Sequence, residues 1–198
     1  MNGFTLNRRH FLASSAVGIA ALAMGSLAPA LAAREPAADS IKRLAALAPI
    51  KQVSTDILDI SYYEAGPEEG RAVILLHGAA GDIQSFAGVA PLLAAQGLRV
   101  IVPYLRGHGS TVYLDDTTPR SEELAVLGQD VIDLMNALHV PEAVLAGYAE
   151  GGRAASTAAL LKPTRCVGLV SLNQPPQDTP SVVADVVVTL AKEGKWRT

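Results

Sequence analysis

Apolar and polar positions follow two rhythms along the chain, and these divide it into strands and helices. Lys51 to Tyr63 alternate and are rich in Val, Ile and Tyr, which predicts one or two outer antiparallel strands. Unbroken apolar runs predict strands buried on both faces at Ala72–Leu76, Arg99–Val102, Ala143–Ala146 and Val167–Leu172. Apolar residues at helical spacing predict four helices. The first covers Ile83–Gln96, and the second begins near Ser121 with Glu122 and Glu123 in its first turn. The third follows the turn at Ala149 and ends at about Leu161, and the fourth covers Ser181–Lys192.

This order of elements predicts an α/β fold with a doubly wound, mostly parallel sheet, because strands that alternate with long helices form right-handed crossovers. Ligands of such sheets bind at the carboxyl ends of the strands. Three predicted loops reach that edge: His77 to Asp82, Arg106 to Ser110, and the turn at Ala149. The functional site is expected there.

Composition limits the classes of protein that need to be considered. The chain has 198 residues, 49% hydrophobic and 18% charged, which predicts one domain with a core. Its net charge of -3 favours neither nucleic acid nor an acidic membrane surface as a partner. A single cysteine, Cys166, excludes an internal disulfide framework and is expected to be a buried apolar residue.

The N-terminus carries a targeting pattern. Asn7 to Leu12 resembles the twin-arginine export motif, and the uncharged stretch that follows ends in Ala30-Leu31-Ala32, a pattern that signal peptidase cuts. A transmembrane anchor is the alternative, since the uncharged run is long enough to span a bilayer. We therefore predict export to the periplasm or the exterior, with membrane contact only through an uncleaved signal. The predicted divisions are a signal at 1–32, a lead-in arm at 33–50, a core at 51–173 and a helical tail at 174–198.

The stretch from Val144 to Ser156 contains the most specific motif. An apolar run breaks at Gly147-Tyr148-Ala149-Glu150-Gly151-Gly152 and resumes as a helix rich in small residues. A strand, a small-x-x-x-small turn and a helix resemble the nucleophile elbow of the α/β-hydrolase superfamily. Gly147-Tyr148 followed by Gly151-Gly152-Arg153 is similar to the elbow of the epoxide hydrolase and haloalkane dehalogenase branch.

Two further segments carry the same resemblance, which extends from about Lys51 to Leu172. Leu75-Leu76-His77-Gly78 resembles the oxyanion-hole loop of that family, and Val100 to Gly109 resembles its next strand and Arg-Gly-x-Gly loop. The resemblance implies that the N–H groups of Ala79 and Glu150 form the oxyanion hole. It also implies a pocket rim formed by His77, Gly78, Arg106, His108 and Tyr148. Loop-fixing hydrogen bonds are the alternative role for His77, Arg106 and His108.

The chain also departs from the family pattern at its centre. Position 149, where the resemblance places the nucleophile, is alanine, which has no group that could attack carbon. Glu150 stands where the branch often has Trp, and Ala80 where the oxyanion loop usually has Pro. The family order is nucleophile, acid, then His, whereas His10, His77, His108 and His139 all precede Ala149.

Two hypotheses follow from these departures. The first is a truncated or diverged exported hydrolase homologue, ancestrally acting on ester, epoxide or carbon–halogen bonds, and now catalytically impaired. The second is a non-catalytic protein that binds a small apolar ligand in the old pocket. A water-activating role for Glu150 is a further alternative. No cofactor, metal or nucleotide is predicted, because neither a phosphate-binding loop nor a cluster of metal ligands is present. The uncovered sheet edge predicts a risk of self-association.

Overall fold

A computed structural model describes residues 45–198 except 119, 122, 174, 176–179 and 194–198. The predicted signal at 1–32 and most of the predicted arm lie outside the described residues. None of the helices in the described part is long and apolar enough to cross a membrane.

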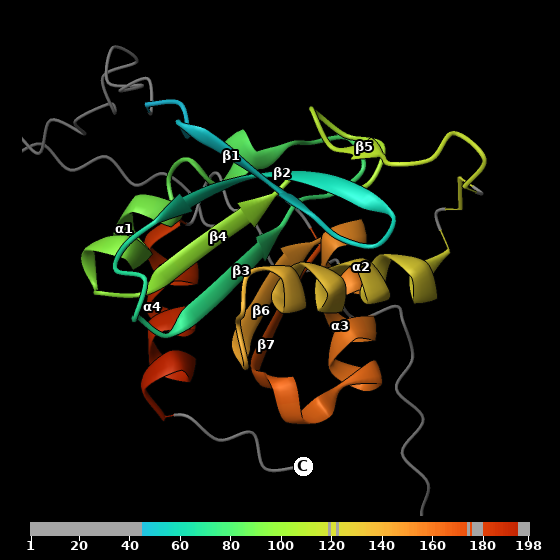
Figure 1. Ribbon diagram of the computed structural model, residues 1–198. Helices are drawn as coiled ribbons and strands as arrows, with labels where there is room; N and C mark the ends of the chain where they lie inside the picture. The colour runs from blue at the N-terminus through green and yellow to red at the C-terminus, as the bar shows by residue number, and fades with distance from the viewer. Residues whose placement is uncertain (1–44, 119, 122, 174, 176–179, 194–198) are drawn as a thin grey trace, which may run out of the picture. The chain divides into compact units, whose positions relative to one another are not determined.

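One mixed sheet organises the described residues (Figure 1). Its strands are β1 (Ile50–Ser54), β2 (Leu58–Ala65), β3 (Ala72–Leu76), β4 (Arg99–Pro103), β5 (Val112–Tyr113), β6 (Ala143–Tyr148) and β7 (Cys166–Leu172). Their order is β1-β2-β4-β3-β6-β7, with β5 paired to β2. The neighbours β4, β3, β6 and β7 run parallel, whereas β1, β2 and β5 join by antiparallel pairing. The predicted α/β class with a mostly parallel sheet is confirmed.

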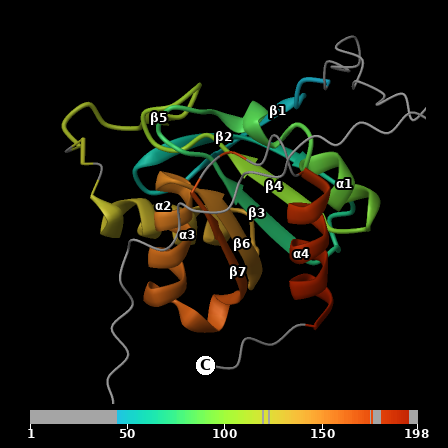
Figure 2. The same cartoon turned by 180° about the vertical axis from the view of Figure 1, so that it is seen from behind.

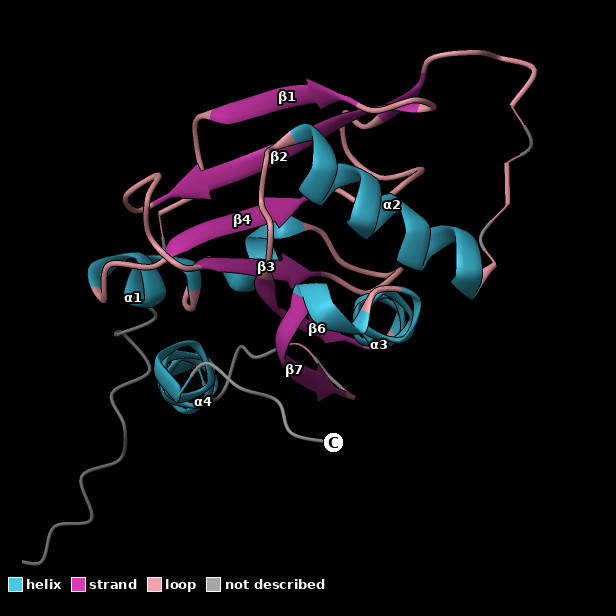
Figure 3. Cartoon of the chain, turned by 60° about the horizontal axis from the view of Figure 1, so that its bottom comes forward, coloured by secondary structure: helices cyan, strands magenta, loops and turns pink. Residues whose placement is uncertain are grey.

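Helices cover both faces of the sheet (Figure 3). The helices α1 (Ala90–Ala95) and α4 (Pro180–Glu193) lie on one face, and α2 (Leu124–Ala137) and α3 (Glu150–Leu161) lie on the other. Strand β3 shows why its sequence is apolar throughout: Val73 and Leu75 join the core under α1 and α4, while Ile74 and Leu76 join the core under α2 and α3. Successive strand residues point to opposite faces, so a central strand needs apolar side chains at every position.

The helix predicted over Ile83–Gln96 is interrupted. A 3₁₀ helix, η1 (Ile83–Phe86), is separated by a turn from α1, which begins at Ala90. Pro91 explains the new start, because proline has no N–H to donate to the preceding turn and is tolerated in the first turn of a helix. Gly97 ends this region with φ +80°, as expected for a residue that follows a helix.

Two other boundaries differ from the sequence prediction. Helix α2 begins at Leu124 rather than near Ser121, so Glu123 precedes the helix instead of lying in its first turn. Leu124 is exposed, and burial begins one turn later at Leu127. The two-residue strand β5 was not predicted, because so short a segment has no periodicity and its pairing with Leu58 and Asp59 depends on the tertiary fold.

Candidate functional site

The turn between β6 and α3 has a strained backbone at Ala149. Its φ of 49° and ψ of -115° lie outside the conformations that residues with a side chain adopt freely. Such a conformation costs on the order of 1–3 kcal/mol and persists only where the surrounding structure enforces it. Here the Ala149 N–H donates to the carbonyl of Leu172 at 2.8 Å, which ties the apex to the end of β7. The elbow geometry is therefore present although residue 149 carries only a methyl group.

Three glycines allow α3 to pass this close to the sheet. A Cβ on Gly151 would lie 2.1 Å from the carbonyl oxygen of Leu76, and a Cβ on Gly147 would lie 2.5 Å from the backbone of Gly151. At Gly152 it would lie 2.6 Å from Ser171 Oγ. The small residues of the motif are thus required by packing between β3, β6 and α3. These steric requirements explain why the spacing was recognisable in the sequence.

An open cavity of about 410 Å³ lies over the elbow. Its lining comes from the loop after β3, the elbow and the segment after β7: Gly78, Ala79, Ala80, Gly81, Ser85, Tyr148, Ala149, Glu150, Arg153, Asn173 and Pro175. Within the described residues, the N–H groups of Ala79 and Glu150 have no hydrogen-bond acceptor. Both residues line the cavity, so these two donors are available to an oxygen atom bound there.

Tyr148 supports the loop opposite the elbow. Its ring is buried and packs against Phe86 at 5.8 Å between ring centroids, and its hydroxyl lies 2.9 Å from Ser85 Oγ. The ring also passes Gly81 so closely that a Cβ there would lie 1.9 Å from the Tyr148 hydroxyl. Of the predicted rim residues, Tyr148 and Gly78 do line the cavity. Ser85 was not predicted as a lining residue, although it lies one helical turn beyond the predicted oxyanion loop.

His77 and His108 connect loops rather than line the cavity. His77 is fully buried, and its Nε2 accepts the Leu105 N–H at 3.1 Å while Nδ1 lies 2.9 Å from the Gly78 carbonyl. His108 lies with Nε2 3.0 Å from the Ala79 carbonyl and Nδ1 3.0 Å from the Arg106 carbonyl. The prediction that these two histidines form part of the rim is wrong, because both rings are occupied in joining the loop after β3 to the loop after β4.

We expect His77 to make the folded state less stable in mild acid. Burial lowers the pKa of His77, so below its ordinary value of about 6.5 the unfolded chain binds more protons than the folded chain. Stability should therefore fall as pH decreases from about 7 through 6.5, until the folded-state pKa is passed. In His77→Gln an amide oxygen can replace Nε2 as the acceptor of the Leu105 N–H, and the side chain no longer titrates. Urea unfolding between about pH 7.5 and 5.5 should show a flatter pH dependence for this variant, and an unchanged slope would contradict the assignment.

The prediction that Arg106 lies on the pocket rim is also wrong, because its side chain does not line the cavity. Its side chain is buried, and Nε and Nη2 donate to the Asp130 carboxylate of α2 at 2.6 and 2.5 Å, while Nη1 donates to the Ser121 carbonyl at 3.0 Å. Burial raises the pKa of Asp130, but two charge-assisted hydrogen bonds favour its ionised form. Burial alone would lower the pKa of Arg106, and the neighbouring carboxylate raises it. Arg106 therefore ties the loop after β4 to α2, as its alternative role predicted.

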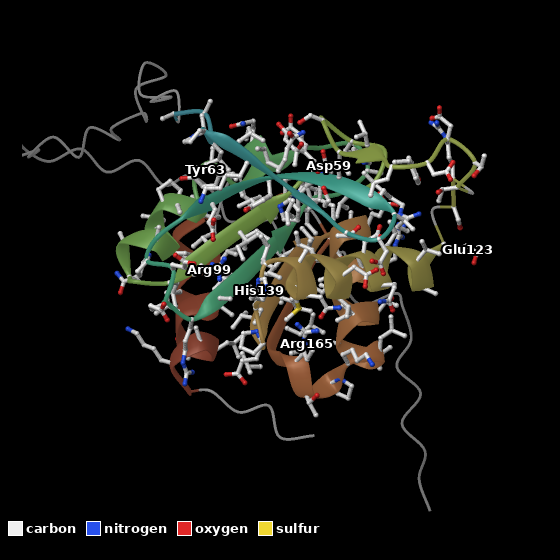
Figure 4. All side chains as sticks on the ribbon, viewed as in Figure 1. Asp59, Tyr63, Arg99, Glu123, His139 and Arg165 are labelled. Atoms are coloured by element: carbon white, nitrogen blue, oxygen red, sulfur yellow. The ribbon has the colours of Figure 1, made fainter. Side chains whose placement is uncertain are left out.

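A second cavity, of about 470 Å³, lies at the opposite, amino-terminal end of the parallel strands. Arg99 and His139, labelled in Figure 4, are among its lining residues. Arg99 is already paired with Glu64 at 2.7 Å. Ligands of parallel sheets bind at the carboxyl ends, so the smaller cavity over Ala149 is the better candidate site. Within the described residues, His, Cys, Asp and Glu side chains do not form a group of three or more that could hold a metal ion.

Comparison with known proteins identifies relatives among hydrolases. Residues 71–193 match the model of the alpha/beta hydrolase fold family. The chain is 31% identical over 129 residues to the sn-1-specific diacylglycerol lipase ABHD11 of Xenopus laevis, covering 64% of this chain and 39% of that protein. It is 33% identical over 109 residues to epoxide hydrolase B of Mycobacterium tuberculosis, covering 54% of this chain and 30% of that protein.

Solved structures give the same result. An epoxide hydrolase-like protein of Klebsiella pneumoniae has a TM-score of 0.62 and 48% sequence identity, over 64% of this chain and 42% of that chain. An epoxide hydrolase of Vigna radiata has a TM-score of 0.56 and 25% identity, over 64% of this chain and 40% of that one. The chain thus spans about two fifths of the structures it resembles.

Proposed function

The chain belongs to the α/β-hydrolase fold family, and from this premise we propose that it is an exported homologue that keeps the substrate pocket but lacks the covalent step. The observation that carries the proposal is Ala149, which occupies the strained apex of the elbow. Relatives described as epoxide hydrolases and a lipase support ancestral substrates with an epoxide or ester group. The twin-arginine pattern supports export, and the intact mass of the exported protein tests cleavage after Ala32.

The missing step is nucleophilic attack. Covalent hydrolysis needs a carboxylate, hydroxyl or thiol that projects from the apex toward an electrophilic carbon. A methyl group at residue 149 cannot form that bond. Loss of the nucleophile from a catalytic triad lowers turnover by roughly a millionfold, and binding with oxyanion contacts leaves about 10³–10⁴ over the reaction in water.

The binding scaffold does not depend on the missing side chain. The N–H groups of Ala79 and Glu150, which have no acceptor in the part of the chain that the structure describes, are backbone donors that can hydrogen-bond a carbonyl or epoxide oxygen. Apolar contact is available from Ala79, Ala80 and Pro175, which line the same cavity. This arrangement favours the second candidate function, binding of a small apolar ligand that carries one oxygen acceptor.

Among the described residues that line the cavity, Glu150 is the one with an acidic side chain. It is the first residue of α3, and Arg153, one turn later, brings a positive charge to the same cavity. A carboxylate beside two N–H donors is able to activate water as a general base. Glu150 is the residue after the apex, however, so its carboxylate does not take the place of a nucleophile at residue 149.

We expect the purified protein to show no turnover of p-nitrophenyl esters, styrene oxide or haloalkanes above buffer. The reason is the absent nucleophile, and the measurement is product formation at high enzyme concentration. Glu150→Gln is the matched variant, since it removes the carboxylate without changing side-chain volume. Turnover that disappears in Glu150→Gln would overturn the proposal and assign a base to residue 150. Calorimetry with the same esters distinguishes ligand binding without hydrolysis from the absence of any binding.

A further inference from the structure

Both ring nitrogens of His108 face carbonyl oxygens. Strands β3 and β4 are parallel neighbours, so the loops that follow them lie at the same edge of the sheet (Figures 1 and 2). Nδ1 of His108 lies 3.0 Å from the Arg106 carbonyl in its own loop, and Nε2 lies 3.0 Å from the Ala79 carbonyl in the loop after β3. A carbonyl oxygen only accepts hydrogen bonds, so each nitrogen must donate. A neutral imidazole has one N–H and the protonated ring has two, so the cationic ring makes both bonds.

The neighbouring ring of His77 has a different set of partners. Its Nε2 accepts the Leu105 N–H at 3.1 Å, so Nδ1 must donate to the Gly78 carbonyl, which lies 2.9 Å away. These two partners fix His77 as a neutral ring that carries its proton on Nδ1. Burial lowers the pKa of His77, and so does a positive charge on His108, whose ring centroid lies 4.8 Å away. A proton taken up by this pair is therefore expected on His108.

The loop after β4 holds the His108 ring in place. The His108 N–H donates to the Leu105 carbonyl at 3.0 Å, and Gly107, the third residue of this turn, has φ +74°, as a type II turn requires. On the other side, the Thr111 N–H donates to the His108 carbonyl at 3.1 Å. The backbone is thus hydrogen-bonded on both sides of the ring. The ring can therefore act as a fixed donor toward the loop after β3.

The two histidines hold the peptide groups on either side of the Ala79 Cα. The Gly78 carbonyl accepts from His77 Nδ1 and from the Gly81 N–H at 2.9 Å. The N–H and C=O of a planar trans peptide point in opposite directions, so these bonds direct the Ala79 N–H away from His77. His108 holds the carbonyl of the next peptide group. The direction of the Ala79 N–H, a donor assigned to the cavity over the elbow, is thereby set from both sides.

Other ionisable side chains also face this pair of rings. Tyr104, which follows β4, lies 6.4 Å from His77 between ring centroids, and burial raises its pKa. Asp82, in the loop after β3, raises the pKa of His77, but by less than burial lowers it. The guanidinium of Arg106 is paired with Asp130 of α2 at 2.6 Å. Tyrosine and aspartate ordinarily titrate outside the range from pH 6 to 8, whereas histidine titrates within it.

We propose that His108 is a positioning residue that works through its proton: as an imidazolium it fastens the loop after β3 to the loop after β4 and holds the Ala79 N–H toward the cavity. The inference rests on the proposed function, ligand binding in that cavity, and adds its regulation. Loss of the proton leaves one N–H for two carbonyl oxygens, so one hydrogen bond between or within the loops is lost. A ligand with an oxygen acceptor should therefore bind more tightly as the pH falls from about 8 to 6.

NMR titration of the full chain tests the role of His108 without a ligand. As the pH falls from about 8 to 5.5, the nitrogen chemical shifts should show His108 protonated at both nitrogens before His77 is. The Ala79 amide signal should follow the same titration, and in His108→Gln it should not. His139→Asn is the matched control, since it removes a histidine at the opposite end of the strands and should leave the titration unchanged. A His108 ring that stays neutral, or an Ala79 amide that does not follow it, would overturn the proposal.

Calorimetry with acetophenone, an uncharged ketone, tests the effect on binding. The unchanged chain should bind it roughly three- to tenfold more weakly at about pH 8 than at about pH 6, the effect of losing one hydrogen bond. His108→Arg keeps a positive charge and several N–H donors at both values, so its affinity should not change between them. Equal affinity of the unchanged chain at both values, or a pH dependence that persists in His108→Arg, would overturn the proposal. Absence of acetophenone binding at either pH would instead contradict the proposed function, and the NMR titration would still decide the role of His108.

Discussion

Ala149→Asp is expected to form a covalent ester with a bromoalkane, whereas the wild-type chain forms none. The new carboxylate would stand at the apex of an elbow whose backbone already has φ 49° and ψ -115°. One carboxylate oxygen attacks the carbon that bears bromine, the C–O bond forms, and bromide leaves with the electron pair of the broken bond. This half-reaction needs no proton transfer, so it depends only on the nucleophile and its position. Intact mass followed by peptide mapping detects the alkyl group on residue 149.

Ala80→Asp provides the positional control, because Ala80 lines the same cavity away from the elbow. Alignment at the apex should make alkylation of Ala149→Asp at least roughly 100-fold faster than alkylation of Ala80→Asp. Equal rates for the two variants would mean that the elbow does not orient an attacking group. Failure of a folded Ala149→Asp protein to react would contradict the assignment of residue 149 as the nucleophile position.

Asp130→Ala is expected to lower the free energy of unfolding by about 3–5 kcal/mol, the range for breaking one side of a buried ion pair. The Arg106 side chain is only 2% exposed, so loss of the carboxylate leaves a buried guanidinium whose charge is no longer paired, although the Ser121 carbonyl and the Tyr113 ring still contact it. Urea unfolding measures the change. The loop after β4 should also become more mobile, because Arg106 ties it to α2.

Lys51→Ala is the matched control for an ion pair at the surface. Lys51 is 52% exposed and pairs with Glu64, and pairs of this kind contribute no more than about 1 kcal/mol. The double variant Arg106→Met with Asp130→Leu should recover much of the stability lost in Asp130→Ala, because it leaves no unpaired charge. A cost below about 1 kcal/mol for Asp130→Ala would show that the guanidinium finds water or another acceptor.

Hydrophobic patterning predicted the order of the main elements, because burial on one or two faces leaves a period in the sequence. The boundaries depended on local chemistry that the period does not report. Pro91 restarts α1 after η1, and α2 begins at Leu124 although the acidic residues before it suggested an earlier start. The C-terminal helix was predicted, but its packing was not: Val183, Ala184 and Val187 are buried in the core beside α1.

The candidate site was also predictable only in part from the sequence. The elbow and the loop after β3 were recognisable in the sequence, since a Cβ on Gly78, Gly147 or Gly151 would lie too close to a neighbouring ring or backbone. The roles of His77, His108 and Arg106 were not. Each is a polar residue in a loop at the correct edge of the sheet, and only the positions of Leu105, Ala79 and Asp130 show that their polar atoms are already occupied.

The sequence by itself determined the fold class, the family and the absence of a nucleophile at residue 149, because these depend on residue identity and on spacing along one segment. The tertiary structure alone decided that the elbow remains strained around Ala149, that Tyr148 and Ser85 share a hydrogen bond, and that Arg106 lies buried on Asp130. These features join residues that are distant in the chain. Their partners are selected by packing of the whole sheet, which no local pattern encodes.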